Sequence, residues 1–296
     1  FDLRPGTAEF VHTVVECAKL AFADREAWYG DAAEVPIDSL LSNAYAGERR
    51  PLVGATADGA QRPGSPDGRV PRLPHIPSVP AGDTDEYDPT TSEPTVSRTG
   101  ETRGDTCHVC VADRFGNLVA ATPSGGWLHS SPVIPALGFP LGTRVQMAWL
   151  EPGLANSLHP GRRPRTTLSP SLALRDGEPV LAFGTPGGDQ QDQWQLGFLL
   201  NHVVGAMNLQ EAIDAPAFHS THFPSSFYPR ESYPKQVVIE ERVGTGVLDE
   251  LRRRGHDVLA SAPWSLGRMC AVARDADGHV RAAANPRGMQ GYAIGR

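Results

Sequence analysis

The stretch TCHVCVADRFGNLVAAT, residues 106–122, decides the fold class. Apolar and polar residues alternate on both sides of DRFGN, which predicts two antiparallel strands joined by a turn at Gly116-Asn117. The pattern returns around Asp176-Gly177 and Asp277-Gly278, so three hairpins follow residue 105. Apolar residues at helical spacing predict helices over residues 7–29, 191–207, 208–215 and 245–255. Paired strands beside clustered helices predict an α+β layered domain with antiparallel sheets.

The CxxC pair inside this stretch, Cys107 and Cys110, suggests a metal or redox site. Strand alternation sends Cys107 to one face and sends His108 and Cys110 to the other. The two thiols cannot easily hold one ion or close a disulfide, so we expect no metal here, and a metal or redox module on this pair is an alternative only. Cys17 and Cys270 are expected to be buried free thiols.

Thr106 lies at the boundary between a polar, irregular segment and the first stretch with a clear strand pattern. Residues 53–103 are rich in Pro, Gly, Ser, Thr and charge without an apolar period, which predicts a long and partly mobile loop. Chains are often cut in such loops. If the Asp105–Thr106 bond is cut, Thr106 gains an α-amine with a pKa of about 7.7–8.0 that can deprotonate its own hydroxyl. Thr106 is then a candidate nucleophile; uncut, it is an ordinary strand residue.

Composition excludes several classes of partner. The 296 residues carry a formal charge of -7, which argues against nucleic acid. No apolar run reaches the roughly 18 residues of a membrane-spanning helix. The chain begins at Phe1 rather than Met, so its compartment is unknown, although a cytoplasmic location is favoured over a periplasmic or secreted one.

Two further stretches could contact a substrate. FGTPGGDQQ, residues 183–191, lies between a predicted strand and a predicted helix. Backbone N–H groups at Gly187 and Gly188 could hold a developing oxyanion there, although a tight turn would explain the glycines equally well. HPGRRPRTTLSPSL, residues 159–172, gathers three arginines and several hydroxyls. It could bind an anionic group or be a capped loop with solvated arginines.

Together these stretches resemble the γ-glutamyltranspeptidase family of N-terminal-nucleophile hydrolases. Five of them are similar to family motifs in the same order: TCHVCVADRFGNLVAAT, HPGRRPRTTLSP, GTPGG, AMNLQEAIDAPAFH and NPRGMQGY. The resemblance implies a four-layer αββα sandwich and a precursor that cuts itself between Asp105 and Thr106. Residues 1–105 would be the C-terminal part of the large subunit, and residues 106–296 the small catalytic subunit.

The resemblance also implies roles for single residues. Thr166 and Thr167 fall on the serine pair that binds the substrate α-carboxylate, and Ser124 falls on a threonine that assists the nucleophile. The implied catalytic set is Thr106, Ser124, Gly187 and Gly188. The implied substrate-binding set is Thr166, Thr167, Gly126, Gln146 and Trp149.

One departure from the family concerns the substrate. Where the family carries aspartates that grip the α-ammonium, TRVQMAWL has Ala148 and Trp149, and Gly126 replaces an asparagine with the same task. Two absent charge-assisted contacts would cost about 1.5–3 kcal/mol each. We therefore expect an amidohydrolase for a small acidic amide such as oxamate, because the motifs ATPSGGW and GTPGGDQQDQW are most similar to those of the oxamate amidohydrolase-like branch of the family. The alternatives are a γ-glutamyltransferase or glutathione hydrolase, and an uncut or degenerate homologue that only binds a ligand.

A second departure is length, because the family's large subunit is much longer than residues 1–105. Part of its sheet, and an arginine for the α-carboxylate, would lie upstream of Phe1. The expected partner is this upstream part, in a heterodimer cut from one precursor, with further dimerisation left open. We expect no cofactor and no metal, nucleic-acid or membrane partner.

Overall fold

The long helix α1 (Ala8–Trp28) confirms the first predicted helix. The computed structural model describes residues 1, 3–31, 33–76, 106–125, 132–228, 230–287 and 291–295. The Thr7 hydroxyl caps α1 by accepting a hydrogen bond from the Phe10 N–H at 3.1 Å. Gly30 follows the helix, and a Cβ there would lie 2.0 Å from the backbone oxygen of Ala155. The glycine therefore lets this later loop pack directly against the end of α1.

Residues 53–76 form part of the predicted long loop, and their first half is held against α1. Two short helices precede this segment, α2 (Ile37–Leu40) and α3 (Asn43–Arg49). Its backbone carbonyls meet buried polar side chains: His12 Nε2 lies 2.8 Å from the Gly54 oxygen, and Lys19 Nζ donates to the Asp58 oxygen at 2.6 Å. These bonds order a segment without helical or strand period. The rest of the predicted loop, through Asp105, lies outside the described residues.

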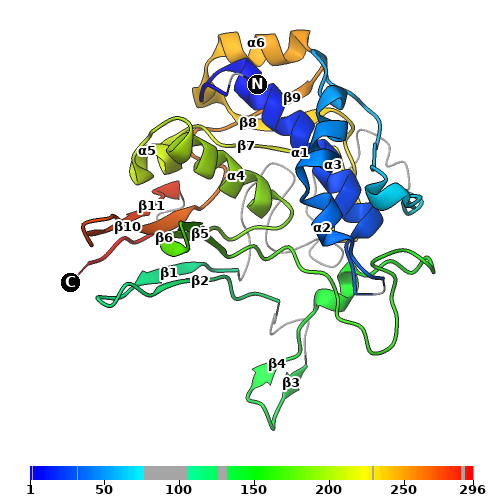
Figure 1. Cartoon of the computed structure of the whole chain (residues 1–296), viewed down its shortest axis with the longest axis horizontal. Coiled ribbons are helices and arrows are strands. Elements are labelled where there is room, and N and C mark those ends of the chain that lie inside the picture. Colours follow the sequence, from blue (N-terminus) through cyan, green and yellow to red (C-terminus); the bar gives the residue numbers. More distant parts are fainter. Residues whose placement is uncertain are drawn as a thin grey trace.

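Two predicted hairpins form one antiparallel sheet in the order β11-β10-β6-β5. Asp176 and Gly177, with φ of 53° and 86°, join β5 to β6, as the turn signal predicts. Helices α4 and α5 cover one face of this sheet with an apolar core that includes Phe183 and Phe198 (Figure 1). The bounds are β5 (Ser171–Arg175), β6 (Glu178–Gly184), β10 (Cys270–Arg274), β11 (Val280–Ala284), α4 (Gln190–Val203) and α5 (Leu209–Asp214).

The hairpin of β1 (Val109–Ala112) and β2 (Leu118–Ala121) packs on the opposite face of this sheet (Figure 1). Its inner face contacts β6 and β10. On its outer face, Val109 and Val111 are 49% and 50% exposed. The described residues therefore supply no layer over this face, where a complete four-layer sandwich would need one.

A three-stranded sheet packs with α1 and α6 (Thr245–Arg253). Its strands are β7 (Phe218–Ser220), β8 (Gln236–Glu240) and β9 (Asp257–Ser261). The β7–β8 pair is antiparallel, but β8 and β9 are parallel, so the expectation of antiparallel sheets is wrong here. The reason is the crossover: α6 lies between the two strands and returns the chain to the same end.

The remaining described elements are small. Strands β3 (Val133–Ile134) and β4 (Phe139–Pro140) form a two-stranded ribbon. Three-residue or four-residue 3-10 turns span Arg50–Leu52, Pro66–Gly68, Arg144–Met147 and Glu241–Val243. Within the described ranges, no helix combines the length and apolar character that a membrane crossing needs.

Candidate active site

The hydroxyls of Thr106 and Ser124 lie side by side, with 2.6 Å between their oxygens. Thr106 precedes β1 and Ser124 follows β2, so the antiparallel register brings the two ends together. A backbone bond from the Cys107 N–H to the Pro123 oxygen, at 3.3 Å, extends the pairing to this point. Thr106 is buried at 7% exposure. The hairpin thus positions both predicted catalytic hydroxyls.

His108 fixes this hairpin on the central sheet. Its Nδ1 lies 2.7 Å from the Thr122 hydroxyl, and its Nε2 lies 3.0 Å from Cys110 Sγ. The ring lies over Gly184 at the end of β6, where a Cβ would come within 2.2 Å of His108 Cε1. Burial lowers the pKa of His108 to about 4, so the ring is neutral at pH 7. These contacts fix the chain at His108, two residues after Thr106.

Gly187 and Gly188 lie in the turn between β6 and α4 and offer two adjacent backbone donors. Gly187 has a φ of 142°, which side chains rarely adopt, and both glycines are buried. Their carbonyls accept from Gln191, which uses its side chain for Gly187 and its N–H, at 3.1 Å, for Gly188. In the described parts of the chain neither glycine N–H has an acceptor. Buried, unpartnered N–H groups of this kind can stabilise an oxyanion.

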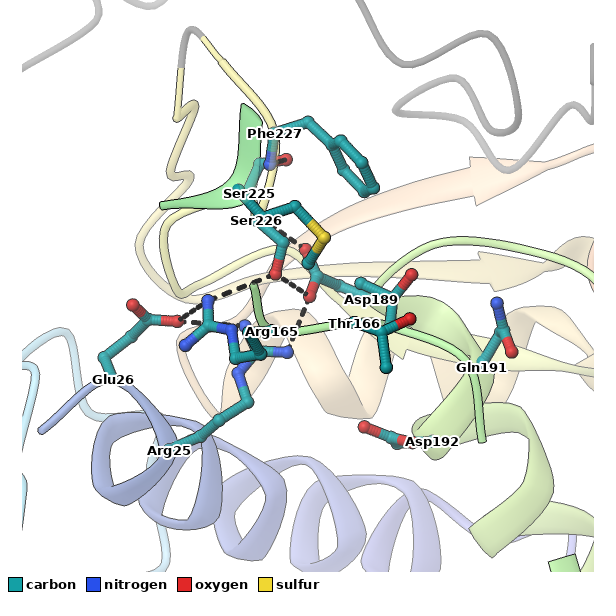
Figure 2. A network of polar contacts seen from close by, with 12 residues as sticks. Arg25, Glu26, Arg165, Thr166, Asp189, Gln191, Asp192, Ser225, Ser226 and Phe227 are labelled. Carbon is teal, nitrogen blue, oxygen red and sulfur yellow. Dashed lines mark hydrogen bonds and ion pairs between the residues drawn. The ribbon is translucent and has the colours of Figure 1, made fainter. Parts of the chain in front are cut away.

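A buried network of charges supports the loop that carries these glycines (Figure 2). Arg25 on α1 donates to Asp189 at 2.6 Å and to Glu26 at 3.1 Å. Arg165 donates to the same Glu26 oxygen at 2.7 Å. Ser226 completes the ring, because its hydroxyl and its N–H both donate to Asp189, at 2.6 and 2.7 Å. Two arginines thus balance two carboxylates across four segments of the chain.

The arginines keep both carboxylates of this network ionised. Burial acts to raise the pKa of Glu26, but Arg165 and Arg25 outweigh it and leave that pKa below its usual range. Burial also acts to raise the pKa of Asp189, but Arg25 and the hydrogen bonds from Ser226 outweigh it, so that pKa is lowered as well. Ionised partners make the network a rigid support rather than a proton donor.

Trp149 and Gln146, both predicted to bind substrate, lie at the edge of this network. Trp149 is 9% exposed, and its Nε1 donates to Glu26 at 3.2 Å. The Arg230 guanidinium stacks on its ring at 4.3 Å and also donates to the Gln146 carbonyl at 3.3 Å. Burial lowers the pKa of Arg230 to about 10. In this arrangement Trp149 braces Glu26.

The predicted carboxylate-binding threonines lie beside Arg165. Thr166 lines a cavity of about 440 Å³ together with Arg25 and Arg165. Thr167 is buried, and its hydroxyl has no hydrogen-bond partner among the described residues. Nε and Nη1 of Arg165 also lack partners there, although the Arg165 side chain is only 9% exposed. These free donors can bind a carboxylate.

The structure brings together only part of the predicted set. Thr106 meets Ser124, while Thr166 and Trp149 reach the charge network from two loops. Asp105 and Gly126 lie outside the described residues. Arg165 belongs to the arginine-rich stretch already singled out, but no pattern in the sequence pointed to the network residues Arg25, Glu26, Asp189 and Ser226. A charged Arg-Glu pair at the end of an otherwise buried helix was the available signal.

The cysteines confirm the strand alternation but correct two expectations. Cys107 is exposed while Cys110 faces the sheet, so the CxxC thiols point to opposite faces. Cys110 instead meets Cys270 of β10, with Cys110 Sγ 3.7 Å from the Cys270 oxygen. Cys17, expected to be buried, is exposed because it falls on the solvent side of α1, and Cys270 is only half-buried.

Known proteins with similar sequences include two proenzymes. The acylase ACY 1 proenzyme of Pseudomonas sp. strain SE83 is 30% identical over 282 residues, which cover 94% of this chain and 42% of the relative. The glutathione hydrolase proenzyme of Pseudomonas sp. strain A14 is 32% identical over 241 residues, covering 76% of this chain and 36% of the relative. The chain therefore spans less than half the length of these curated relatives.

A solved structure, that of LmbA2991HD, is 60% identical to this chain. It superposes with a TM-score of 0.86 over 98% of this chain and 49% of that chain. The family model described as Gamma-glutamyltranspeptidase matches residues 1–295. Because this match covers nearly the whole chain, the protein belongs to the γ-glutamyltranspeptidase family.

Proposed function

We propose that this protein is a self-processing amidohydrolase whose nucleophile is Thr106. The observation that carries the proposal is the 2.6 Å contact between the Thr106 and Ser124 hydroxyls. Ser124 can orient the Thr106 oxygen and accept or return its proton as the charge on that oxygen changes. The anchored ring of His108 supports the proposal, because it holds β1 in place.

The first reaction is the cut itself. The Thr106 hydroxyl attacks the carbonyl carbon of Asp105, the peptide C–N bond breaks, and the hydroxyl proton moves to the freed α-amine. Water then hydrolyses the ester, which releases the Asp105 carboxylate and leaves Thr106 at a new N-terminus. Residues 1–105 and 106–296 become separate polypeptides that stay associated through the packed core. We infer that the upstream part of the precursor completes this heterodimer.

Turnover uses the same oxygen. The α-amine of Thr106 takes the hydroxyl proton while the oxygen attacks the substrate amide carbon. The N–H groups of Gly187 and Gly188 stabilise the resulting oxyanion. The C–N bond then breaks, and the leaving amine takes the proton from the α-ammonium. Water then attacks the acyl ester while the α-amine accepts its proton. The ester C–O bond breaks, the α-ammonium returns the proton to the Thr106 oxygen, and the acid leaves.

Buried donors beside Arg165 support a proposal for the substrate class. The free donors of Arg165 and Thr167 favour an acyl group that carries a carboxylate. The buried carboxylates Glu26 and Asp189 are both engaged by arginines, so neither is free to hold a substrate ammonium. We propose a small acidic amide without an α-amino group, with oxamate as the test compound.

A γ-glutamyl substrate is the second candidate, and Asp192 favours it. Asp192 lines the same cavity as Thr166 and Arg165. Its carboxylate accepts a hydrogen bond from the Ser169 hydroxyl and could also receive an α-ammonium. In that case the protein would be a γ-glutamyltransferase or glutathione hydrolase.

The deciding assay uses the full-length protein and two substrates. We expect ammonia release from oxamate and no p-nitroaniline from γ-glutamyl-p-nitroanilide. The reverse result would refute the proposed substrate class but would leave the family assignment intact. Thr167→Val should lower kcat/KM for the acidic amide about 10-fold to 100-fold, because it removes one bond to a charged group. Thr56→Val, in an exposed loop, is the matched control. A protein that is neither cut nor active on either compound would be a binding homologue, contrary to the proposal.

A further inference from the structure

Three potential metal ligands meet between the nucleophile hairpin and the central sheet. They are His108, directly before β1, Cys110, on β1, and Cys270, at the start of β10. One ligand atom from each residue lies within 4.8 Å of the other two, and all three residues are half-buried. Cys107 takes no part, because it is on the other face of the strand. This cluster is therefore a different site from the CxxC pair.

The histidine is held in the way that metal-binding histidines are held. Its Nδ1 lies 2.7 Å from the Thr122 hydroxyl, and its ring lies flat against Gly184, which has no Cβ to displace it. Nε2 is thereby directed at Cys110 Sγ, 3.0 Å away. Ligating histidines are commonly oriented through the nitrogen that does not bind the metal.

Apart from the contact between Cys110 Sγ and His108 Nε2, which joins two of the proposed ligands, the thiols have only weak partners to give up. Cys110 Sγ lies 3.7 Å from the Cys270 carbonyl oxygen, and Cys270 Sγ lies 3.9 Å from the His108 carbonyl oxygen. Contacts of sulfur with oxygen at this range are weak compared with a metal–thiolate bond. Both thiols are therefore available as ligands.

We propose that His108, Cys110 and Cys270 bind one zinc-like ion. Bonds of about 2.3 Å to sulfur and about 2.0–2.1 Å to nitrogen place tetrahedral ligands roughly 3.5–3.8 Å apart, so the ligand atoms need to move by about 1 Å or less. Each thiol releases one proton to solvent when the ion binds. Two thiolates and a neutral imidazole neutralise a divalent charge, which suits a half-buried site, and the fourth position is left for water.

Such an ion would join β1 to β10 two residues beyond Thr106. It would stabilise the folded state by an amount that grows with the logarithm of its free concentration, since it binds a site that the unfolded chain lacks. Its role is to hold the strand rather than to take part in turnover.

The test is metal binding by the reduced full-length protein, with Zn²⁺ and Co²⁺ as probes. We expect about one retained ion per chain after gel filtration, a thiolate-to-cobalt absorption band and a rise in Tm with added Zn²⁺. Cys107→Ser, on the opposite face, should keep all three properties. Cys110→Ser and Cys270→Ser should lose them.

Three results would overturn the proposal. They are a wild-type protein without the cobalt band, a Cys110→Ser/Cys270→Ser double variant that retains the ion, and a denatured, unreduced wild type with only two reactive thiols. The last result would mean that Cys110 and Cys270 form a disulfide. If a serine variant does not fold, the cobalt band of the wild type and of Cys107→Ser still decides, because it requires no change at the ligands.

Discussion

Replacing Gly184 with alanine would push a methyl group into the ring of His108. The new Cβ would lie 2.2 Å from Cε1, 2.6 Å from Nε2 and 2.7 Å from Nδ1 of that ring, well inside any real contact. The ring cannot stay in place, so its 2.7 Å contact with Thr122 breaks and the start of β1 moves. Overpacking of this kind costs about 1–3 kcal/mol. A displacement of about 1 Å at the nucleophile can slow the reaction about 100-fold.

Urea unfolding and the rate of self-cleavage measure the two effects of Gly184→Ala separately. We expect a lower unfolding midpoint and slower formation of the fragment that begins at Thr106. Gly197→Ala is the matched control, because no atom lies within 4 Å of its new Cβ inside α4. That change should be neutral or stabilise by up to about 1 kcal/mol. If Gly184→Ala unfolds and cleaves like the wild type, His108 does not position the nucleophile strand.

Three further changes test the surroundings of the site. Burial is the main cause that lowers the pKa of His256 to about 4. The free energy of unfolding should therefore fall by up to about 3 kcal/mol as the pH drops from 6.5 to 4. In urea titrations, His256→Gln should make this fall with pH smaller. Asp189→Asn should cost about 3–5 kcal/mol, because it leaves the buried Arg25 only Glu26, a carboxylate that Arg25 shares with Arg165, whereas the exposed control Asp249→Asn should change stability by less than about 0.5 kcal/mol. Ser124→Ala should slow turnover about tenfold or more while Ser124→Thr retains most of it, and equal rates for the two variants would refute the role of this hydroxyl.

Local signals account for the elements that the sequence predicts well. The Asp176-Gly177 turn needs positive φ at both residues, and few residue pairs accept it. The capping box of α5 is complete, since Asn208 and Glu211 each bind the other's backbone. Such features depend on neighbours in the chain, so a sequence is enough to find them.

The misses all depend on contacts between distant segments. The anchoring of the loop near Asp58 comes from side chains of α1 such as Lys19, and the parallel β8–β9 pair depends on where α6 packs. Arg25 and Asp189 are 164 residues apart, and Cys110 and Cys270 are 160 apart. No periodicity or motif links residues at that separation, so the network and the cysteine cluster become visible only in the fold.

Mass analysis of the purified full-length protein and its Thr106→Ala variant tests the central claim most directly. The account predicts that the wild type contains a fragment beginning at Thr106, and that the variant stays intact and inactive while keeping the wild-type fold. A variant that is still cut at this bond, or that retains turnover, would contradict the assignment of Thr106 as the nucleophile.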